Sequence, residues 1–223
     1  PPSDPKDLQR FIRAAEDQSI EAELITRDDY GSLAEYDALF IRSTTVVNNY
    51  TFRFSRRAQS EGLVVIDDPD SIVRCANKVF LAESFERNHV PAPKTVIVHK
   101  DNKNLVLMQL GLPCILKQPD SSFSQGVVKV KTREEYEAAI DALLDKSDLI
   151  IAQEFVPTEF DWRIGILDRA PLYACRYYMA RGHWQIYDHS KKGSARFGRC
   201  DTLPVADAPP DVVQTALKAA HAI

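Results

Sequence analysis

The chain has 223 residues, of which 44% are hydrophobic and 27% are charged. This length exceeds one typical domain and is short for two large ones, so two or three small lobes are expected. The 28 Lys and Arg residues are balanced by 32 Asp and Glu residues, which leaves no basic excess and argues against nucleic acid as the main partner. The apolar runs are no longer than strands, so no membrane partner is expected.

The cysteines indicate the redox environment. Cys75, Cys114, Cys175 and Cys200 lie far apart, and none belongs to a Cys-x-x-Cys pair. This spacing does not suit a structural zinc site, and it predicts reduced thiols in a cytoplasmic protein.

Helices and apolar strands alternate over the first third of the chain. The patterns predict helices at residues 7–17 and 50–61 and strands at residues 22–25, 38–41 and 63–66. Fully apolar strands separated by helices are typical of a small parallel sheet that is covered on both faces. We therefore predict an α/β lobe at residues 1–74 that lacks its first strand and is joined to the rest by residues 67–76.

Two α+β lobes are predicted next, at residues 75–156 and 157–223. In the first, the patterns predict helices at residues 78–88, 104–110 and 133–146 and strands at residues 94–98, 115–117 and 127–130. A strand at residues 148–156 then crosses into the second lobe. There, closely connected strands at residues 162–167, 171–179 and 183–187 predict an antiparallel meander, and a final helix starts near Pro209.

Lys117 ends an apolar strand, and a loop of small residues follows it. This loop contains Ser121, Ser122, Ser124, Gln125 and Gly126. Hydroxyls and backbone N–H groups bind anions, and a glycine permits close approach of the backbone. A nucleotide polyphosphate is the simplest ligand for this lysine and loop, and a solvated lysine is the alternative.

Lys78 has a placement that also indicates an anion. It opens a predicted helix, where a positive charge opposes the helix dipole. An anion bound at this helix end would explain that placement. A solvated lysine in the first turn is the alternative.

The strand that crosses between the lobes ends in a candidate purine site. Gln153 and Glu154 are followed by Phe155, Val156 and Pro157. A strand that enters a hinge offers backbone N–H and C=O groups to the rim of a purine, and apolar side chains can cover its face. Glu154 could equally be a carboxylate at the rim.

Charged residues on the next two strands complete the candidate site. Asp161 and Arg163 share one face of a strand because side chains alternate. Arg176 lies in an otherwise apolar strand, where it needs an anion such as a phosphate or a substrate carboxylate. We expect Arg163 and Arg176 on the same side of the site. A salt bridge from either arginine to a local acid is the alternative.

The order of these segments, over residues 63–223, resembles the ATP-grasp superfamily, and is most similar to RimK-type and glutathione-synthetase-like ligases. The resemblance implies a small parallel-sheet lobe followed by two α+β lobes that hold ATP between them. It implies phosphate contacts from Lys78 and Lys117, a lid at residues 121–126, and adenine contacts from Glu154 and Phe155. The implied nucleotide set also includes Gln153, Val156, Asp161 and Gln185.

The resemblance further implies an ATP-dependent ligase that joins a carboxylate to an amine through an acyl phosphate. Arg163 and Arg176 would act on the transferred phosphate and the substrate carboxylate. Family members carry their Mg²⁺ ligands on strands that would lie beyond Ile223, so the sequence is interpreted as a fragment that is inactive by itself. A regulatory nucleotide-binding module and a kinase are the alternatives.

The substrates are less well indicated. Arg42, Ser43 and Asn48 follow a buried strand, at the edge where α/β sheets bind ligands, so they are candidates for binding the substrate. An ordinary polar loop is the alternative. The resemblance implies an amino-acid or peptide carboxylate, with glutamate as one candidate, and an amine. Homo-oligomerisation is left open.

Overall fold

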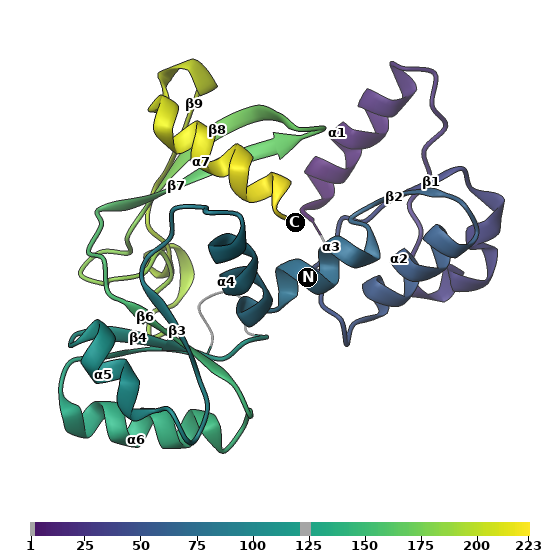
Figure 1. Ribbon diagram of the computed structural model, residues 1–223. Helices are drawn as coiled ribbons and strands as arrows, with labels where there is room; N and C mark the ends of the chain where they lie inside the picture. Colours follow the sequence, from purple (N-terminus) through teal and green to yellow (C-terminus); the bar gives the residue numbers. More distant parts are fainter. Residues whose placement is uncertain (1–2, 121–125) are drawn as a thin grey trace. The chain divides into compact units, whose positions relative to one another are not determined.

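The computed structural model describes residues 3–120 and 126–223 (Figure 1). The chain divides into two compact units, Pro1–Ala76 and Asn77–Ile223. Helix α3 (Pro69–Ala76), which the sequence analysis did not predict, occupies most of the segment between the first two lobes. Asp68 accepts a hydrogen bond from the Ser71 backbone N–H at 2.9 Å, and Pro69 opens the helix, so an ordinary helix start is present.

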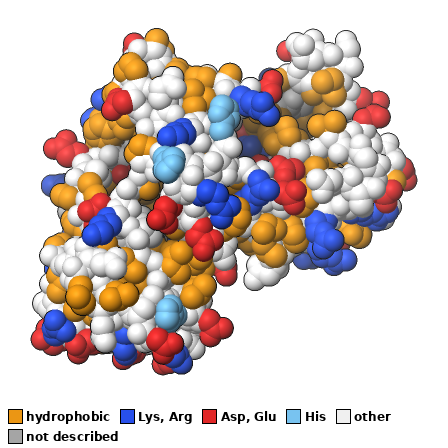
Figure 2. Space-filling model, in the orientation of Figure 1, with side chains coloured by type: hydrophobic (Ala, Val, Ile, Leu, Met, Phe, Trp, Pro, Cys, Tyr) orange, Lys and Arg blue, Asp and Glu red, His pale blue; other side chains and the backbone are white. Residues whose placement is uncertain are grey.

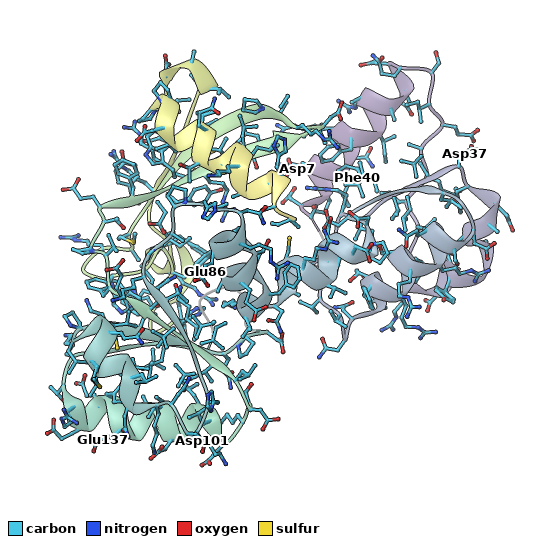
Figure 3. All side chains as sticks on the ribbon, viewed as in Figure 1. Asp7, Asp37, Phe40, Glu86, Asp101 and Glu137 are labelled. Carbon is cyan, nitrogen blue, oxygen red and sulfur yellow. The ribbon has the colours of Figure 1, made fainter. Side chains whose placement is uncertain are left out.

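The first unit contains a parallel pair of strands, as predicted. Strands β1 (Ala38–Phe40) and β2 (Val64–Ile66) run parallel with Leu39 opposite Val65. Helices α1 (Pro5–Glu16) and α2 (Tyr50–Ser60) accompany them. Phe40, labelled in Figure 3, meets the Phe11 ring of α1 edge to face at 5.2 Å between centroids.

The predicted strand at residues 22–25 is wrong. These residues pair with no strand in the part of the chain that the structure describes, and Ala22, Glu23 and Leu24 are exposed. A 3₁₀ segment, η1 (Arg27–Glu35), follows, and Thr26 and Asp29 cap it reciprocally. Without a partner to receive its backbone hydrogen bonds, a short apolar stretch does not become a strand.

The second unit begins with helix α4 (Lys78–Arg87) and a four-stranded sheet. The sheet has the order β3 (Thr95–Val98), β6 (Ile150–Glu154), β4 (Cys114–Lys117) and β5 (Val127–Val130), and all neighbours are antiparallel. Helices α5 (Asn104–Leu110) and α6 (Arg133–Leu144) lie on one side of it (Figure 1).

One face of this sheet forms the main core. Val98, Leu116, Ile140 and Ile150 are at most 1% exposed and belong to a cluster that joins the sheet to α6. Burial of such side chains contributes about 1.5–3 kcal/mol each. Because side chains alternate along a strand, Lys117 and Gln153 lie on the other face, away from this core.

The last part of the unit is the predicted antiparallel meander, with a different third strand. Strands β7 (Phe160–Leu167) and β8 (Ala170–Tyr178) pair as expected. The third strand is β9 (Cys200–Leu203), whereas the predicted strand at residues 183–187 is wrong. Gly182 adopts a positive φ of 74°, which starts a turn, and only Tyr187 in that range forms a bridge, with Phe197.

Helix α7 (Pro210–His221) covers one face of the meander. Trp162 and Ile164 of β7 and Ala174 of β8 pack in one cluster with Val213 and Leu217 of α7. The opposite face of the same strands carries Asp161, Arg163 and Tyr177. No helix among the described residues has the length and apolarity needed to cross a membrane.

Candidate nucleotide-binding site

Two lysines are brought together at the end of β4. Lys117 is the last residue of β4, and Lys78 is the first residue of α4. The backbone N–H and the Nζ of Lys78 both donate to the Pro119 carbonyl, at 3.0 and 3.3 Å. Asn77 caps α4 with its side-chain oxygen and also donates to Asp120 at 3.1 Å. These bonds hold the start of α4 against the segment that follows Lys117.

Both lysines are in an environment that penalises their charge. Burial lowers the pKa of Lys78 below its ordinary 10.5, and Asp120 partly opposes this. Burial also lowers the pKa of Lys117, and the positive charge of Lys78 lowers it further. Two ammonium groups that are half-buried and close together favour a bound anion, because an anion offsets both costs.

The Lys117 ammonium is held by a neutral group. Its Nζ donates to Gln153 Oε1 at 2.6 Å, and Gln153 Nε2 donates to Thr95 Oγ1 at 2.9 Å. An amide accepts the hydrogen bond without adding negative charge. The positive charge of Lys117 therefore stays available to a ligand.

The charged face of the meander is turned towards this lysine. Asp161 is near enough to oppose the lowering of the Lys117 pKa. Arg163 shares this face and lies over the Tyr177 ring, with its guanidinium carbon 4.4 Å from the ring centroid. Such stacking orients a guanidinium while leaving its N–H groups available. Asp161 thus lies near the lysine pair, and Arg163 shares its strand face.

Arg176 does not join them, and the expectation that Arg163 and Arg176 lie on the same side is wrong. Arg176 is opposite Trp162, whereas Arg163 is opposite Cys175. Directly opposed residues point to the same face of a sheet, so the two arginines point to opposite faces. Arg176 instead forms a salt bridge with Asp201 of β9, at 3.4 Å, as in the alternative interpretation.

An irregularity in the β7–β8 hairpin explains this outcome. The register shifts by one residue between Gly165 and Ile166. Because the side-chain period of a strand is two residues, a shift of one residue moves every later side chain of β8 to the other face. The alternation of side chains within one strand does not reveal this shift, because the shift concerns how two strands are paired.

The strand that crosses between the predicted lobes is β6, and it ends at Glu154, whose carboxylate has a partner in the protein. The Glu154 carboxylate accepts a hydrogen bond from the Lys94 backbone N–H at 2.6 Å, and its own N–H donates to the Lys94 carbonyl at 2.9 Å. Its carboxylate is therefore bound to the residue that precedes β3. Val156 is 50% exposed just after the hinge.

Two hinge-side residues were missed by the sequence analysis. Lys129 Nζ lies 3.2 Å from the Phe155 ring centroid, and Trp184 meets the same ring edge to face at 6.1 Å. Lys129 and Trp184 also line a cavity of about 840 Å³ beside β5 and α6. Lys129 shares the sheet face of Lys117 because Val127 is opposite Lys117 and side chains alternate. This alternation was the available signal for Lys129.

The remaining predicted residues fall in three places. Ser121, Ser122, Ser124 and Gln125 lie outside the described residues. Gly126 has a positive φ of 63°, and its carbonyl accepts from Gln118 at 3.0 Å. Gln185 lies in a turn next to Trp184, where its N–H donates to His183 Nδ1 at 3.2 Å and its carbonyl accepts from Ala180.

The candidate substrate residues belong to the first unit. The Arg42 guanidinium carbon lies 4.7 and 5.1 Å from the ring centroids of Phe11 and Phe40, and its buried Nε has no hydrogen-bond partner among the described residues. Ser43 accepts a 3.4 Å hydrogen bond from the Tyr50 hydroxyl. Asn48 is exposed in the turn before α2.

Solved structures share the fold of this chain. A D-cycloserine synthetase superposes with a TM-score of 0.71 over 97% of this chain and 75% of its own, at 18% identity. The D-alanine–D-alanine ligase of Bacillus anthracis gives a TM-score of 0.68 over 91% of this chain and 66% of its own, at 14% identity. This chain thus shares the fold of these ligases, which confirms the predicted ATP-grasp fold class.

Sequence comparison identifies the family. Residues 88–222 match the family described as the D-Ala-D-Ala ligase C-terminus. This match covers more than half of the chain, and the chain belongs to this ATP-grasp family.

Two glutamate ligases are more similar to this chain in sequence than the two solved structures above. The ribosomal protein bS6–L-glutamate ligase of Shigella boydii is 28% identical over 56% of this chain and 42% of its own length. A probable α-L-glutamate ligase of Shewanella halifaxensis is 25% identical over 56% of this chain and 28% of its own. The matches to these two relatives thus cover less than half of either relative's length.

Proposed function

We propose that this protein is an ATP-dependent ligase that joins a carboxylate to an amine, and that Asn77–Ile223 binds the nucleotide. The observation that supports the proposal best is the pair of half-buried lysines near Asp161, which shares a face of the meander with Arg163. The Lys117 ammonium donates to a neutral amide, and a cation in such a place suits a phosphate of ATP. The charge on the visible face of the molecule is mixed, with Lys and Arg interspersed with Asp and Glu (Figure 2).

In this proposal, each part of the site binds a different part of ATP. Lys78 and Lys117 bind phosphate oxygens, and Asp161 binds the sugar. The backbone of the hinge at Glu154 and Phe155 contacts the adenine rim, and Trp184 and Lys129 cover its faces after the Lys129 side chain has moved off the Phe155 ring. We assign Arg163 to the transferred phosphate because it lies on the Asp161 face, and we assign Arg176 a structural role through Asp201.

The proposed reaction has two steps. A carboxylate oxygen attacks the γ-phosphorus of ATP, the bond to the β–γ bridging oxygen breaks, and ADP leaves. The amine nitrogen then attacks the carbonyl carbon of the acyl phosphate, and phosphate leaves as the amine loses a proton. Arg163 and the lysines stabilise the negative charge on the phosphoryl oxygens.

No group of three or more His, Cys, Asp or Glu side chains among the described residues is placed to hold a metal ion. Mg²⁺ is proposed only as a component of the ATP substrate, and no step is assigned to a metal ligand of the described residues.

The names of the glutamate ligases suggest the substrate class. We propose an amino acid or a peptide carboxylate, with glutamate as the first candidate. The first unit is the proposed substrate lobe. There, the Arg42 guanidinium lies over two aromatic rings, and its buried Nε has no partner in the part of the chain that the structure describes, so it is suited to a carboxylate.

Hydroxylamine trapping tests the reaction class. With ATP, Mg²⁺, hydroxylamine and either glutamate or a peptide that ends in glutamate, the full-length protein is expected to form a hydroxamate and to release ADP and phosphate. ATP binding without ADP release would instead indicate a regulatory module. ADP release with a phosphorylated alcohol and no hydroxamate, in a screen of carboxylates and alcohols, would indicate a kinase.

The lowered pKa values of the lysines predict proton uptake on ATP binding. In the free protein, burial lowers the pKa of Lys78 and Lys117 below 10.5, so a fraction of each is neutral at alkaline pH. Bound phosphates raise both values again, so protons are taken up between the lowered pKa and 10.5, and affinity falls as the pH rises through that window.

Calorimetry at alkaline pH, in buffers of different ionisation enthalpy, measures this uptake. Lys117→Arg keeps its charge at these pH values, so uptake is expected to decrease, and the double variant with Lys78→Arg should lose it. Equal uptake in the parent protein and the double variant would contradict the assignment.

A further inference from the structure

The hydrogen bonds around Lys117 extend beyond the residues that would touch ATP. We propose that Thr95 is a positioning residue for Lys117 and that it acts through the side-chain amide of Gln153. The sequence analysis assigned Thr95 no role and placed Gln153 at the nucleotide. The inference rests on the proposed function in one respect, namely that Lys117 binds a phosphate.

Three neighbouring strands bring the three side chains together. Gln153 of β6 is opposite Thr95 of β3 on one side and Ile115 of β4 on the other. Lys117 follows Ile115 by two residues and therefore shares its face. The Gln153 amide lies between the Thr95 hydroxyl and the Lys117 ammonium, at 2.9 and 2.6 Å.

The direction of each hydrogen bond follows from the donors available. The Thr95 hydroxyl donates its single proton to the Pro93 carbonyl at 2.8 Å. Towards Gln153 it can then only accept, which requires the NH₂ group of the amide on that side. The Gln153 oxygen is thereby turned to Lys117, whose ammonium is a donor only.

Without the Thr95 hydroxyl, the Gln153 amide is no longer held in this orientation. In Thr95→Val the methyl group occupies the place of the oxygen, so the amide NH₂ loses its acceptor. The amide is then free to rotate. If its NH₂ group turned towards Lys117, two hydrogen-bond donors would face each other and no bond would form. Lys117 loses an acceptor that stabilises its charged form, so its pKa falls further, and it is less well aimed at a phosphate.

A neutral amide at this position also avoids competition with the ligand. In Gln153→Glu, a carboxylate of nearly the same shape would pair with Lys117 and oppose the approach of a phosphate. This variant is expected to raise the pKa of Lys117 and yet to weaken ATP binding. A variant that merely lost structure would not raise the Lys117 pKa, so a raised pKa together with weaker ATP binding distinguishes an altered position of Lys117 from unfolding.

The test measures two properties in Thr95→Val, with Thr95→Ser as the matched control that keeps the hydroxyl. ATP affinity is measured by calorimetry. The pKa of Lys117 is measured without nucleotide, from the pH dependence of its acetylation by acetic anhydride, read by mass spectrometry of the peptide that contains it.

Thr95→Val is expected to weaken ATP binding about 3- to 10-fold and to lower the Lys117 pKa, whereas Thr95→Ser stays near the parent protein. An unchanged Lys117 pKa in Thr95→Val, or equal effects of Val and Ser, would overturn the inference. The acetylation measurement needs no nucleotide. If the parent protein fails to bind ATP, the proposed function is wrong. The acetylation measurement still tests whether Thr95 acts on Lys117 through Gln153.

Discussion

Lys117→Ala is expected to weaken ATP binding by roughly tenfold to a hundredfold. Removing a hydrogen bond to a charged partner costs about 1.5–3 kcal/mol. Lys117 is partly buried, and its present partner is a neutral amide, so solvent screens its attraction for a phosphate less than at a surface. Calorimetric titration with ATP gives the affinity directly.

Lys146→Ala is the matched control for this experiment. Lys146 follows α6 and is exposed, so its removal changes the net charge equally without touching the candidate site. Its ATP affinity is expected to stay within about twofold of the parent value, because screening reduces the effect of distant surface charges. If Lys117→Ala binds ATP as tightly as Lys146→Ala does, the phosphate site has been assigned to the wrong residue.

Arg163→Ala is expected to reduce hydroxamate formation by about 100-fold or more while ATP affinity changes little. Loss of one preorganised donor to a charged transition state typically costs about 10²–10³ in rate. Arg163 lies on the face of the meander that carries Asp161, and the Tyr177 ring holds its guanidinium. Tyr177→Phe keeps that ring surface and is expected to retain most of the activity.

Arg176→Ala provides the contrast. Arg176 lies on the opposite face of the same sheet and is paired with Asp201. Its removal is expected to lower the melting temperature. At a temperature where the protein stays folded, the rate of hydroxamate formation is expected to stay near the parent value. The reverse result, with Arg176→Ala inactive and Arg163→Ala active, would show that the register does not decide which arginine meets the phosphate.

Local patterns in the sequence were sufficient for most elements and for the family. Thr132 caps α6 by accepting from the Glu135 N–H at 3.2 Å, and Asn77 caps α4. Apolar strands of the α+β lobe lie where the pattern predicted them, and Lys117 does end one of them. Caps, periodicity and strand ends depend on residues a few positions apart, so a sequence can show them directly.

Two elements that depend on a distant partner were not predicted correctly. Residues 22–25 are apolar enough for a strand but have no partner among the described residues, whereas the mixed sequence at Cys200–Leu203 becomes β9 because β8 offers a free edge. Strand formation requires hydrogen bonds from a neighbour. Whether such a neighbour exists is decided by tertiary structure.

The same reason explains which expectations about the placement of the charged side chains agree with the structure and which do not. The sequence by itself determined which charged residues were available and that Asp161 and Arg163 share a face. Only the tertiary structure decided that Arg176 faces the other way, because one register shift in the hairpin reverses every later side chain of β8. It also decided that Thr95 reaches Lys117 through Gln153, since that contact crosses three strands whose order in the sheet is not their order in the chain.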